Sequence, residues 1–276
     1  MNGRPDPLDR LRARVARLGA PLCLGIDPHP DALPDELPRD VGGIERFARG
    51  LVEAAAEHAA AVKINVAFFE AFGSPGWAAL ERLVGDLPDD HFLLLDAKRG
   101  DIGPTAERYA ASLFGLLGAD AVTLSPYLGE DSVEPFLAYP GRVVYLVART
   151  SNPSGGSLQD LPVAGAPLHE RVASWVASTW TDGRVGLVVG ATVPAELERL
   201  RRIAPGLGFL VPGVGAQGGD LGAALAFCDG TAAPGLVSIS RGIAGASRGD
   251  AWRSAAAASA LAWLGRMQEA GATLPA

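Results

Sequence analysis

Short apolar runs alternate along the chain with longer segments whose apolar residues recur at helical spacing. Each run ends at turn residues, a pattern typical of fully buried strands, while the longer segments are predicted to be helices. The first helix, for example, carries Leu8, Leu11 and Val15 on one face. Strands are predicted at 22–28, 60–65, the start of 91–102, 120–126, 142–148, 185–190, 208–212 and 235–240. Helices are predicted at 7–19, 43–58, 75–85, 104–117, 130–139, 167–180, 194–203, 219–228 and 249–269.

Each predicted strand is followed by a helix or by a loop and a helix. Strands that alternate with helices indicate a parallel sheet. Eight such units in about 250 residues are typical of a (β/α)₈, or TIM, barrel, in which functional groups lie at the C-terminal strand ends. We therefore predict a single α/β barrel domain over 1–276, with 1–20 as an N-terminal helical extension. The alternative is a doubly wound sheet, but no G-x-G-x-x-G dinucleotide fingerprint follows the first strand.

Composition narrows the class of protein. Hydrophobic residues make up 48% of the 276 positions, enough for a large core, and the net charge is −7. An acidic protein is poorly suited to nucleic acid or to anionic membrane, so neither is expected as a partner. The two cysteines lack metal-ligand spacing, and the charged N-terminus does not resemble a signal peptide. These features predict a cytoplasmic protein.

The segment 91–102 carries the strongest candidate chemistry. Its apolar run ends in Asp96 and Lys98, which alternate to the same side of a strand. Gly100 then allows the chain to turn before Asp101. Two acids and a base at the end of a buried strand are costly unless they pair or take part in chemistry. A structural ion pair that closes the strand end is the alternative explanation.

Polar residues also end the neighbouring predicted strands, with Asp27 after the first, Lys63 in the second and Ser125 after the fourth. Each has an ordinary structural explanation, since Asp27 precedes a proline in a turn and a lysine can extend to solvent from a strand end. In a barrel, however, the C-terminal strand ends meet at one site. We therefore predict a network of alternating acids and bases there.

Glycine-rich loops follow the last two predicted strands. The loop 212–220 contains Gly213 and Gly215, and Arg241 follows the eighth strand. Glycine-rich backbone lets N–H groups approach an anion, and barrels commonly bind phosphate at loops seven and eight. Arg241 adds a forked cation suited to phosphate. Ordinary tight turns are the alternative, but the combination favours a phosphorylated small-molecule substrate.

Five segments together resemble one known family. D-A-K-R-G-D-I-G-P-T, from Asp96 to Thr105, resembles the D-x-K-x-x-D-I-x-x-T signature of orotidine 5′-phosphate decarboxylases. The other similar segments are L-G-I-D, V-K-I-N, P-G-V-G-A-Q-G-G-D and S-R-G-I, at strands one, two, seven and eight. T-S-N-P-S-G from Thr150 and V-V-G-A-T from Val188 are similar to the longer bacterial, or type 2, subgroup. The resemblance covers the whole chain.

The resemblance implies conversion of orotidine 5′-monophosphate to UMP and CO₂, the last step of de novo pyrimidine synthesis, without a metal or cofactor. Lys98 would donate the proton to C6 of the pyrimidine, within a charged tetrad of Lys63, Asp96, Lys98 and Asp101. Asp101, Ile102 and Thr105 would reach the neighbouring subunit's site, which implies a homodimer. The other implied contacts are Asp27 and Lys63 with ribose, Ser125 with the pyrimidine edge, Gln217 with base and phosphate, and Arg241, Gly242, Gly213 and Gly215 with phosphate.

Other functions remain alternatives. A Mg²⁺-dependent sugar-phosphate lyase of the same suprafamily would carry an acidic metal ligand where this chain has Lys63, and a cation there repels Mg²⁺. A Schiff-base aldolase needs a lysine of lowered pKa, whereas neighbouring carboxylates act in the opposite direction. A non-catalytic phosphate-binding barrel would not require the whole tetrad.

Two features remain open in the sequence. Ser125 is followed by Pro126, where many family members have histidine, so its contact with the base is less well supported than the other matches. The turn-rich loop 150–166 is longer than most connections, which favours a functional role. The loop 213–220 is the candidate lid over the substrate.

Overall fold

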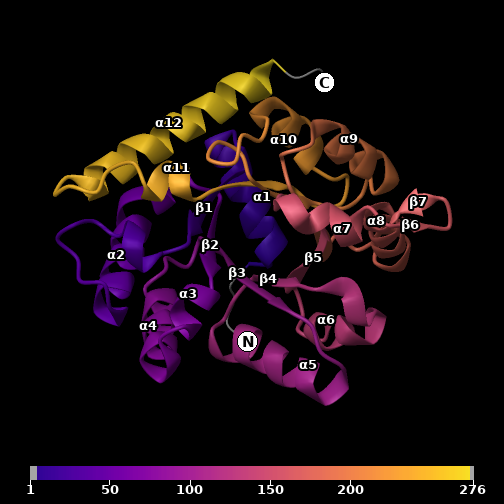
Figure 1. Cartoon of the computed structure of the whole chain (residues 1–276), viewed down its shortest axis with the longest axis horizontal. Coiled ribbons are helices and arrows are strands. Elements are labelled where there is room, and N and C mark those ends of the chain that lie inside the picture. The colour runs from indigo at the N-terminus through magenta and orange to yellow at the C-terminus, as the bar shows by residue number, and fades with distance from the viewer. Residues whose placement is uncertain (1–4, 274–276) are drawn as a thin grey trace.

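The computed structural model describes residues 5–273, which form a closed barrel of eight parallel strands (Figure 1). Every predicted strand corresponds to one of these, so the expected (β/α)₈ barrel is confirmed. A short antiparallel hairpin of β6 (Pro162–Val163) and β7 (Ala166–Pro167) lies outside the barrel. In barrel order the strands are β1 (Leu22–Ile26), β2 (Ala61–Asn65), β3 (Phe92–Arg99), β4 (Ala121–Leu124), β5 (Val143–Arg149), β8 (Val185–Val189), β9 (Phe209–Pro212) and β10 (Leu236–Ile239), which pairs with β1.

The strands are continuous apolar runs because a parallel barrel is covered on both faces, by helices outside and by packed side chains inside. Every residue of β1 and of β8 is buried. The long α12 runs along one edge of the helical ring (Figure 1). Among the described helices, none is long and apolar enough to cross a membrane. The ring comprises α2 (Val41–Ala55), α3 (Ala67–Glu70), α4 (Gly73–Gly85), α5 (Gly103–Ala110), α6 (Glu134–Leu137), α7 (Gly156–Gln159), α8 (Leu168–Thr179), α9 (Pro194–Ile203), α10 (Leu221–Cys228), α11 (Arg241–Ala244) and α12 (Trp252–Ala272).

The main differences from the predicted elements lie between barrel strands. The segment 130–139 is a 3₁₀ turn followed by the four-residue α6, because Pro135 has no backbone N–H and fits only the first turn of a helix. The helix that begins at α5 continues to Leu116 as a π-helix. The segment 150–166 is not a bare loop, because it contains a 3₁₀ turn, α7 and β6.

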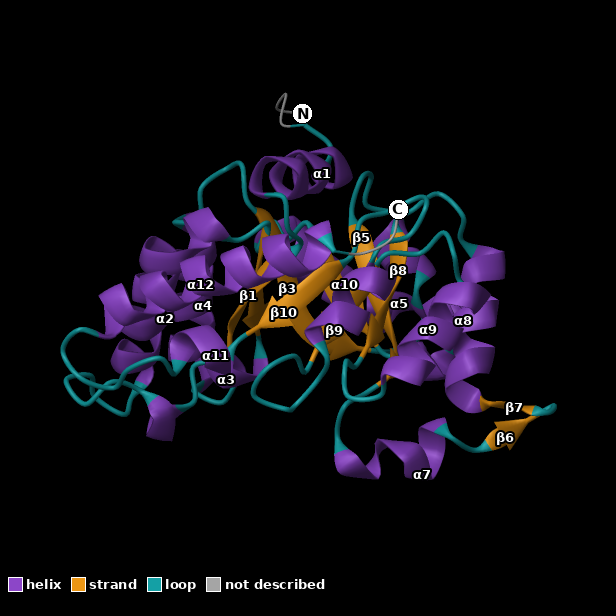
Figure 2. Cartoon of the chain, turned by 90° about the horizontal axis from the view of Figure 1, so that it is seen from above, coloured by secondary structure: helices purple, strands orange, loops and turns teal. Residues whose placement is uncertain are grey.

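A helix near the N-terminus, α1 (Pro7–Leu18), closes the mouth of the barrel at the N-terminal strand ends. Figure 2 shows it across one end of the barrel, with α7 and the hairpin at the other. Leu8 and Leu11 pack in one buried cluster with Phe92 and Tyr145 from the barrel interior. The interior of the barrel is therefore filled with side chains at its N-terminal end.

The polar face of α1 is buried as well, which its helical pattern did not indicate. Arg10 and Arg14 are only 7% and 3% exposed. The Arg10 guanidinium donates to the carboxylate of Asp120 and, at 2.6 Å, to the carbonyl of His91. Arg14 donates to the carbonyl of Ala59 at 2.6 Å. These bonds join α1 to the segments that precede β2, β3 and β4.

Candidate active site

A cavity of about 730 Å³ opens at the C-terminal ends of the strands. Because parallel strands all point the same way, every strand or the loop that follows it contributes to the lining. The contributions, in barrel order, include Asp27, Lys63, Asp96, Thr123, Ser151, Val188, Gly213 and Ser240. The acids and bases that the sequence placed at separate strand ends therefore share one site.

Asp96 bridges two lysines in this cavity. Its Oδ2 lies 3.1 Å from Nζ of Lys63, and its Oδ1 lies 2.5 Å from Nζ of Lys98. Lys63 also lies 3.6 Å from Oδ1 of Asp27. Lys63 is 5% exposed, whereas half of the Lys98 side chain is exposed. Lys98 can therefore contact a ligand, while the buried Lys63 pairs with Asp27 and Asp96.

The surroundings of Asp27, Lys63 and Asp96 keep these three side chains charged. Burial disfavours the ammonium of Lys63, but the carboxylates of Asp27 and Asp96 outweigh this effect and raise the pKa of Lys63 above the usual lysine value. Burial likewise opposes the carboxylate of Asp96, but Lys63 and Lys98 hold the pKa of Asp96 well below its usual range. Burial also opposes the carboxylate of Asp27, but the attraction of Lys63 together with hydrogen bonds from Ser240 and Asn65 lowers the pKa of Asp27 below its usual value. Near neutral pH these groups are ionised.

The end of β3 is not a regular strand. Lys98 has a φ of +44°, in the left-handed region that residues with a Cβ rarely adopt. The turn that the sequence assigned to Gly100 is therefore made earlier, at Lys98. Gly100 has a different reason to be glycine, because a Cβ there would lie 3.2 Å from Cβ of Ser125. Strained backbone at this position is typical of a functional site.

The two glycine-rich loops meet over one aromatic ring. Gly213, Gly215 and Gly218 have φ values of +102°, +78° and +77°. A Cβ on Gly215 would lie 3.0 Å from the ring of Trp263 in α12, and one on Gly242 would lie 2.9 Å from it. The loop after β9 and the start of α11 thus both require glycine where they pack on Trp263, and this contact places their backbones beside each other.

The side of the cavity near these loops suits an anion. Arg241 lines the cavity at its exposed rim, and it has no ion-pair partner within residues 5–273. Gln217 reaches across the opening, where its Oε1 accepts a hydrogen bond from Oγ of Ser151 at 2.7 Å. The cavity therefore has an unpaired cation at one side and the Lys63–Asp96–Lys98 network at the other.

Arg149, at the end of β5, holds the following segment in place. Its Nε donates to Oε2 of Glu196 at 2.7 Å and its Nη1 to Oε1 of Gln159 at 3.1 Å. Side-chain atoms of Asp160, His169 and Glu196 lie within 4.8 Å of one another, a spacing that could hold a metal ion. Because Arg149 pairs with both carboxylates, we interpret the cluster as a salt-bridge network.

Five predicted site residues lie outside the cavity of this chain. Asp101 is half-buried, Thr105 is exposed and Ile102 is 57% exposed, and none of them lines the cavity. Ser125 does not line it either, because its side chain packs beneath Gly100 and its N–H bonds to Arg99 O at 2.7 Å. Gly215, in the loop 212–220, does not line the cavity either, because it packs against Trp263.

Several lining residues were not singled out from the sequence. Ser151 lines the cavity and donates a hydrogen bond to Gln217, and the T-S-N-P-S-G motif was its only signal in the sequence. Thr123 lies within an apolar run and gave no signal. Asn65 and Phe68 also line the cavity.

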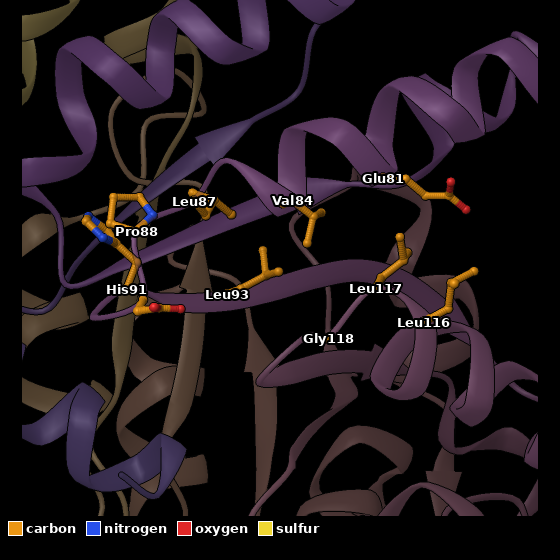
Figure 3. A pocket seen from close by; sticks show the side chains of 11 residues that line it. Glu81, Val84, Leu87, Pro88, His91, Leu93, Leu116, Leu117 and Gly118 are labelled. Atoms are coloured by element: carbon orange, nitrogen blue, oxygen red, sulfur yellow. The ribbon is translucent and has the colours of Figure 1, made fainter. Parts of the chain in front are cut away.

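A second cavity, of about 370 Å³, lies at the opposite end of the barrel, between the end of α4 and the start of β3 (Figure 3). Its walls combine apolar side chains, such as Val84 and Leu117, with the polar side chains of Glu81 and His91. Nε2 of His91 lies 3.0 Å from the carbonyl oxygen of Ala56. Within residues 5–273, no lysine or arginine lines this cavity, so it is poorly suited to phosphate.

Comparison with known proteins agrees with this geometry. The model of the orotidine 5′-phosphate decarboxylase / HUMPS family matches residues 20–255. An orotidine 5′-phosphate decarboxylase of Roseiflexus castenholzii is 51% identical over 238 residues, which are 85% of this chain and 87% of that protein. One of Herpetosiphon aurantiacus is 43% identical over 259 residues, 93% of this chain and 96% of that protein. The solved OMP decarboxylase of Leishmania donovani has a TM-score of 0.85 at 38% identity, covering 98% of this chain and 100% of that chain.

Proposed function

This chain belongs to the orotidine 5′-phosphate decarboxylase / HUMPS family, and we propose that it is a carboxy-lyase that converts orotidine 5′-monophosphate into UMP and CO₂. The observation that carries this proposal is Asp96 held between Lys63 and Lys98, opposite the anion-binding side of the same cavity. That arrangement suits a substrate with a phosphate at one end and a reacting carboxylate at the other. The reaction would complete de novo UMP synthesis.

The proposed chemistry uses the charge of Lys98. Loss of CO₂ leaves negative charge at C6 of the pyrimidine, and a fixed ammonium beside it stabilises that charge before donating a proton. Asp96 faces the substrate carboxylate and disfavours the bound ground state, while its own charge is maintained by Lys63. No cofactor is needed to accept the electron pair, because the proton of Lys98 quenches it.

The presence of lysine, and not arginine, at position 98 supports proton donation. Lys63 and Lys98 are the only lysines in the sequence, and every other member of its 24 basic residues is arginine. A guanidinium keeps its proton at any ordinary pH and cannot serve as an acid, whereas an ammonium can. Lysine thus occurs only where this proposal requires its chemistry or its compact charge.

The remaining contacts anchor the substrate. Binding of the phosphate draws the loop 213–220 closed, so that remote binding energy assists the reaction at the base. The bond between Ser151 and Gln217 is the contact that this closure would tighten. We assign Asp27 and Lys63 to the ribose hydroxyls, Gln217 to base and phosphate, and Arg241, Gly242, Gly213 and Gly215 to the phosphate.

A Mg²⁺-dependent sugar-phosphate lyase is the second candidate, because the family description also covers HUMPS proteins. The position of Lys63 argues against it. Its ammonium lies between Asp27 and Asp96, at 3.6 Å and 3.1 Å, and so occupies the place where those carboxylates could hold a cation. A divalent ion would have to displace a buried charge from that place.

The two candidates differ in their response to EDTA. We expect the purified protein to convert orotidine 5′-monophosphate at the same rate with and without EDTA, because Lys98 supplies the charge that a metal would otherwise provide. The measurement is the loss of the ultraviolet absorbance of the substrate, with added Mg²⁺ as the matched control. Absence of turnover, or turnover only with Mg²⁺, would overturn the proposed function.

We propose that the enzyme is a homodimer with shared sites. Ile102 is 57% and Tyr127 is 80% exposed, although both are large apolar side chains near the C-terminal ends of β3 and β4. Asp101 and Thr105 lie beside them and outside the cavity of their own chain. A second copy that covers this surface would bury the apolar side chains and bring Asp101 to its site.

Mixing two inactive variants tests this arrangement. Asp96→Asn disables the site of its own subunit, whereas Asp101→Asn disables that of the partner. A heterodimer therefore keeps one site with both defects and one with neither, and activity should return on mixing. The activity of refolded mixtures, compared with each variant refolded alone, is the measurement. If the mixtures stay as inactive as the variants, Asp101 does not act across subunits.

The reducing cytoplasm is the compartment that we propose. Cys23 and Cys228 are both buried and unpaired, as expected for a protein that does not rely on disulfides. The net charge of −7 also suits a freely diffusing enzyme more than one bound to anionic surfaces.

A further inference from the structure

We propose that Thr123 is a positioning residue that sets the geometry of the Asp96–Lys98 pair. This inference rests on the proposed decarboxylase function and concerns the same site. Thr123 is a residue of β4, is 1% exposed and lies beneath the two charged side chains at the edge of the cavity. Its side chain contacts Asp96 and the backbone of β3, and it acts on the ammonium of Lys98 through them.

The pairing of β3 with β4 is interrupted at this point. Leu95 pairs with Val122, and the next pair is Arg99 with Leu124. Between these pairs β3 has three residues, 96–98, where β4 has only Thr123. The bulge thus consists of the residues that carry the proposed chemistry, and bulges are known to redirect side chains next to active sites.

The hydroxyl of Thr123 replaces the missing backbone bonds. Its Oγ1 accepts the N–H groups of both Ala97 and Lys98, each at 3.0 Å. A buried N–H without a partner is costly, so these two bonds are what allows β3 to leave the regular ladder. They also hold Lys98 at its left-handed φ of +44°, a conformation that persists only where the surroundings enforce it.

The same hydroxyl orients Asp96. A hydroxyl has one hydrogen to donate and two lone pairs to accept. Because the two N–H groups use both lone pairs of Thr123, its hydrogen points to Oδ1 of Asp96, which lies 2.9 Å away. That oxygen also binds Nζ of Lys98. One side chain therefore fixes the carboxylate, the ammonium-bearing residue and the backbone between them.

The alternative is that Thr123 is only a β-branched residue that fills a strand position. Valine has nearly the same shape and would fill that position equally well. It has no hydroxyl, however, so it can neither accept the two N–H bonds nor donate to Asp96. Serine keeps the hydroxyl but loses the methyl group. Thr123→Val and Thr123→Ser thus separate the hydrogen bonds from the packing.

The experiment measures kcat and KM for orotidine 5′-monophosphate, with UMP binding followed by calorimetry. For Thr123→Val we expect kcat to fall by about 10²-fold, the effect of misplacing a reacting group by about 1 Å, while the Kd of UMP stays unchanged. For Thr123→Ser we expect most of kcat to remain. Rates are divided by the number of sites titrated with UMP, so that partial unfolding does not mimic the effect.

Three results would overturn the inference: full kcat in Thr123→Val, an equal loss in Thr123→Ser, or a change confined to KM. If Thr123→Val yields no folded protein, Thr123→Cys takes its place, because the thiol is of similar size but bonds weakly. An inactive wild-type protein would instead refute the proposed function.

Discussion

Replacing Lys98 with alanine is expected to abolish turnover while leaving UMP binding measurable. The variant loses both the ammonium that stabilises charge at C6 and the proton that completes the reaction, so kcat should fall by roughly 10³-fold or more. Binding should persist because the proposed phosphate contacts, at Arg241 and the loop after β9, do not involve Lys98. The absorbance assay gives kcat, and calorimetric titration with UMP gives the affinity.

Lys98→Arg distinguishes proton donation from charge alone. Arginine keeps a positive charge beside Asp96 but does not release a proton at neutral pH, so this variant should also be inactive. Substantial turnover in Lys98→Arg, or in Lys98→Ala, would rule out the role as proton donor. The matched control is Arg202→Ala, which removes an exposed cation that pairs with Glu198 on α9 and should leave kcat unchanged.

Replacing Asp120 with alanine is expected to destabilise the fold more than any surface charge change. Asp120 is fully buried and accepts hydrogen bonds from Arg10, from Arg142 at 2.9 Å and from the N–H of Leu93 at 2.9 Å. Its removal leaves two guanidinium groups facing a buried site without a counter-charge, a change that typically costs about 3–5 kcal/mol. For a protein of this size we expect Tm to fall by roughly 10 °C.

Thermal unfolding measures this effect, and the control is Asp9→Asn on α1, the helix that carries Arg10. Asp9 pairs with Arg12 at 3.1 Å, but both side chains are well exposed, so its loss should change stability by less than about 1 kcal/mol. At 25 °C the folded fraction of Asp120→Ala should retain its kcat, because Asp120 lies at the opposite end of the barrel from the cavity. A Tm within a few degrees of wild type would contradict the role assigned to Asp120.

The fold was predictable from the sequence because each barrel strand is buried on both faces. Continuous apolar runs such as β1 and β8 therefore stand out against the helical periodicity between them. Once eight parallel units are recognised, topology alone brings their C-terminal ends together. Asp27, Lys63 and Asp96 could thus be assigned to one site before any distance was known. The family motifs then added Gln217 and Arg241, which line the same cavity.

The tertiary structure decided which side chains line the cavity and which are packed elsewhere. Ser125 and Ser151 both follow strands, but only Ser151 lines the cavity, because Ser125 is packed against Gly100. Arg10 and Arg14 resemble solvated positions of a surface helix, yet they are buried, because α1 lies across the mouth of the barrel. These outcomes depend on segments far apart in the chain, which periodicity along one segment does not report.

The end of β3 shows both contributions in one place. Sequence alone determined that Asp96 and Lys98 lie together at the end of a buried strand. Only the tertiary structure placed the left-handed turn at Lys98 and a bulge opposite Thr123. The physical reason is that a bulge arises from the pairing of two strands, and its missing hydrogen bonds are supplied by a residue of the neighbouring strand.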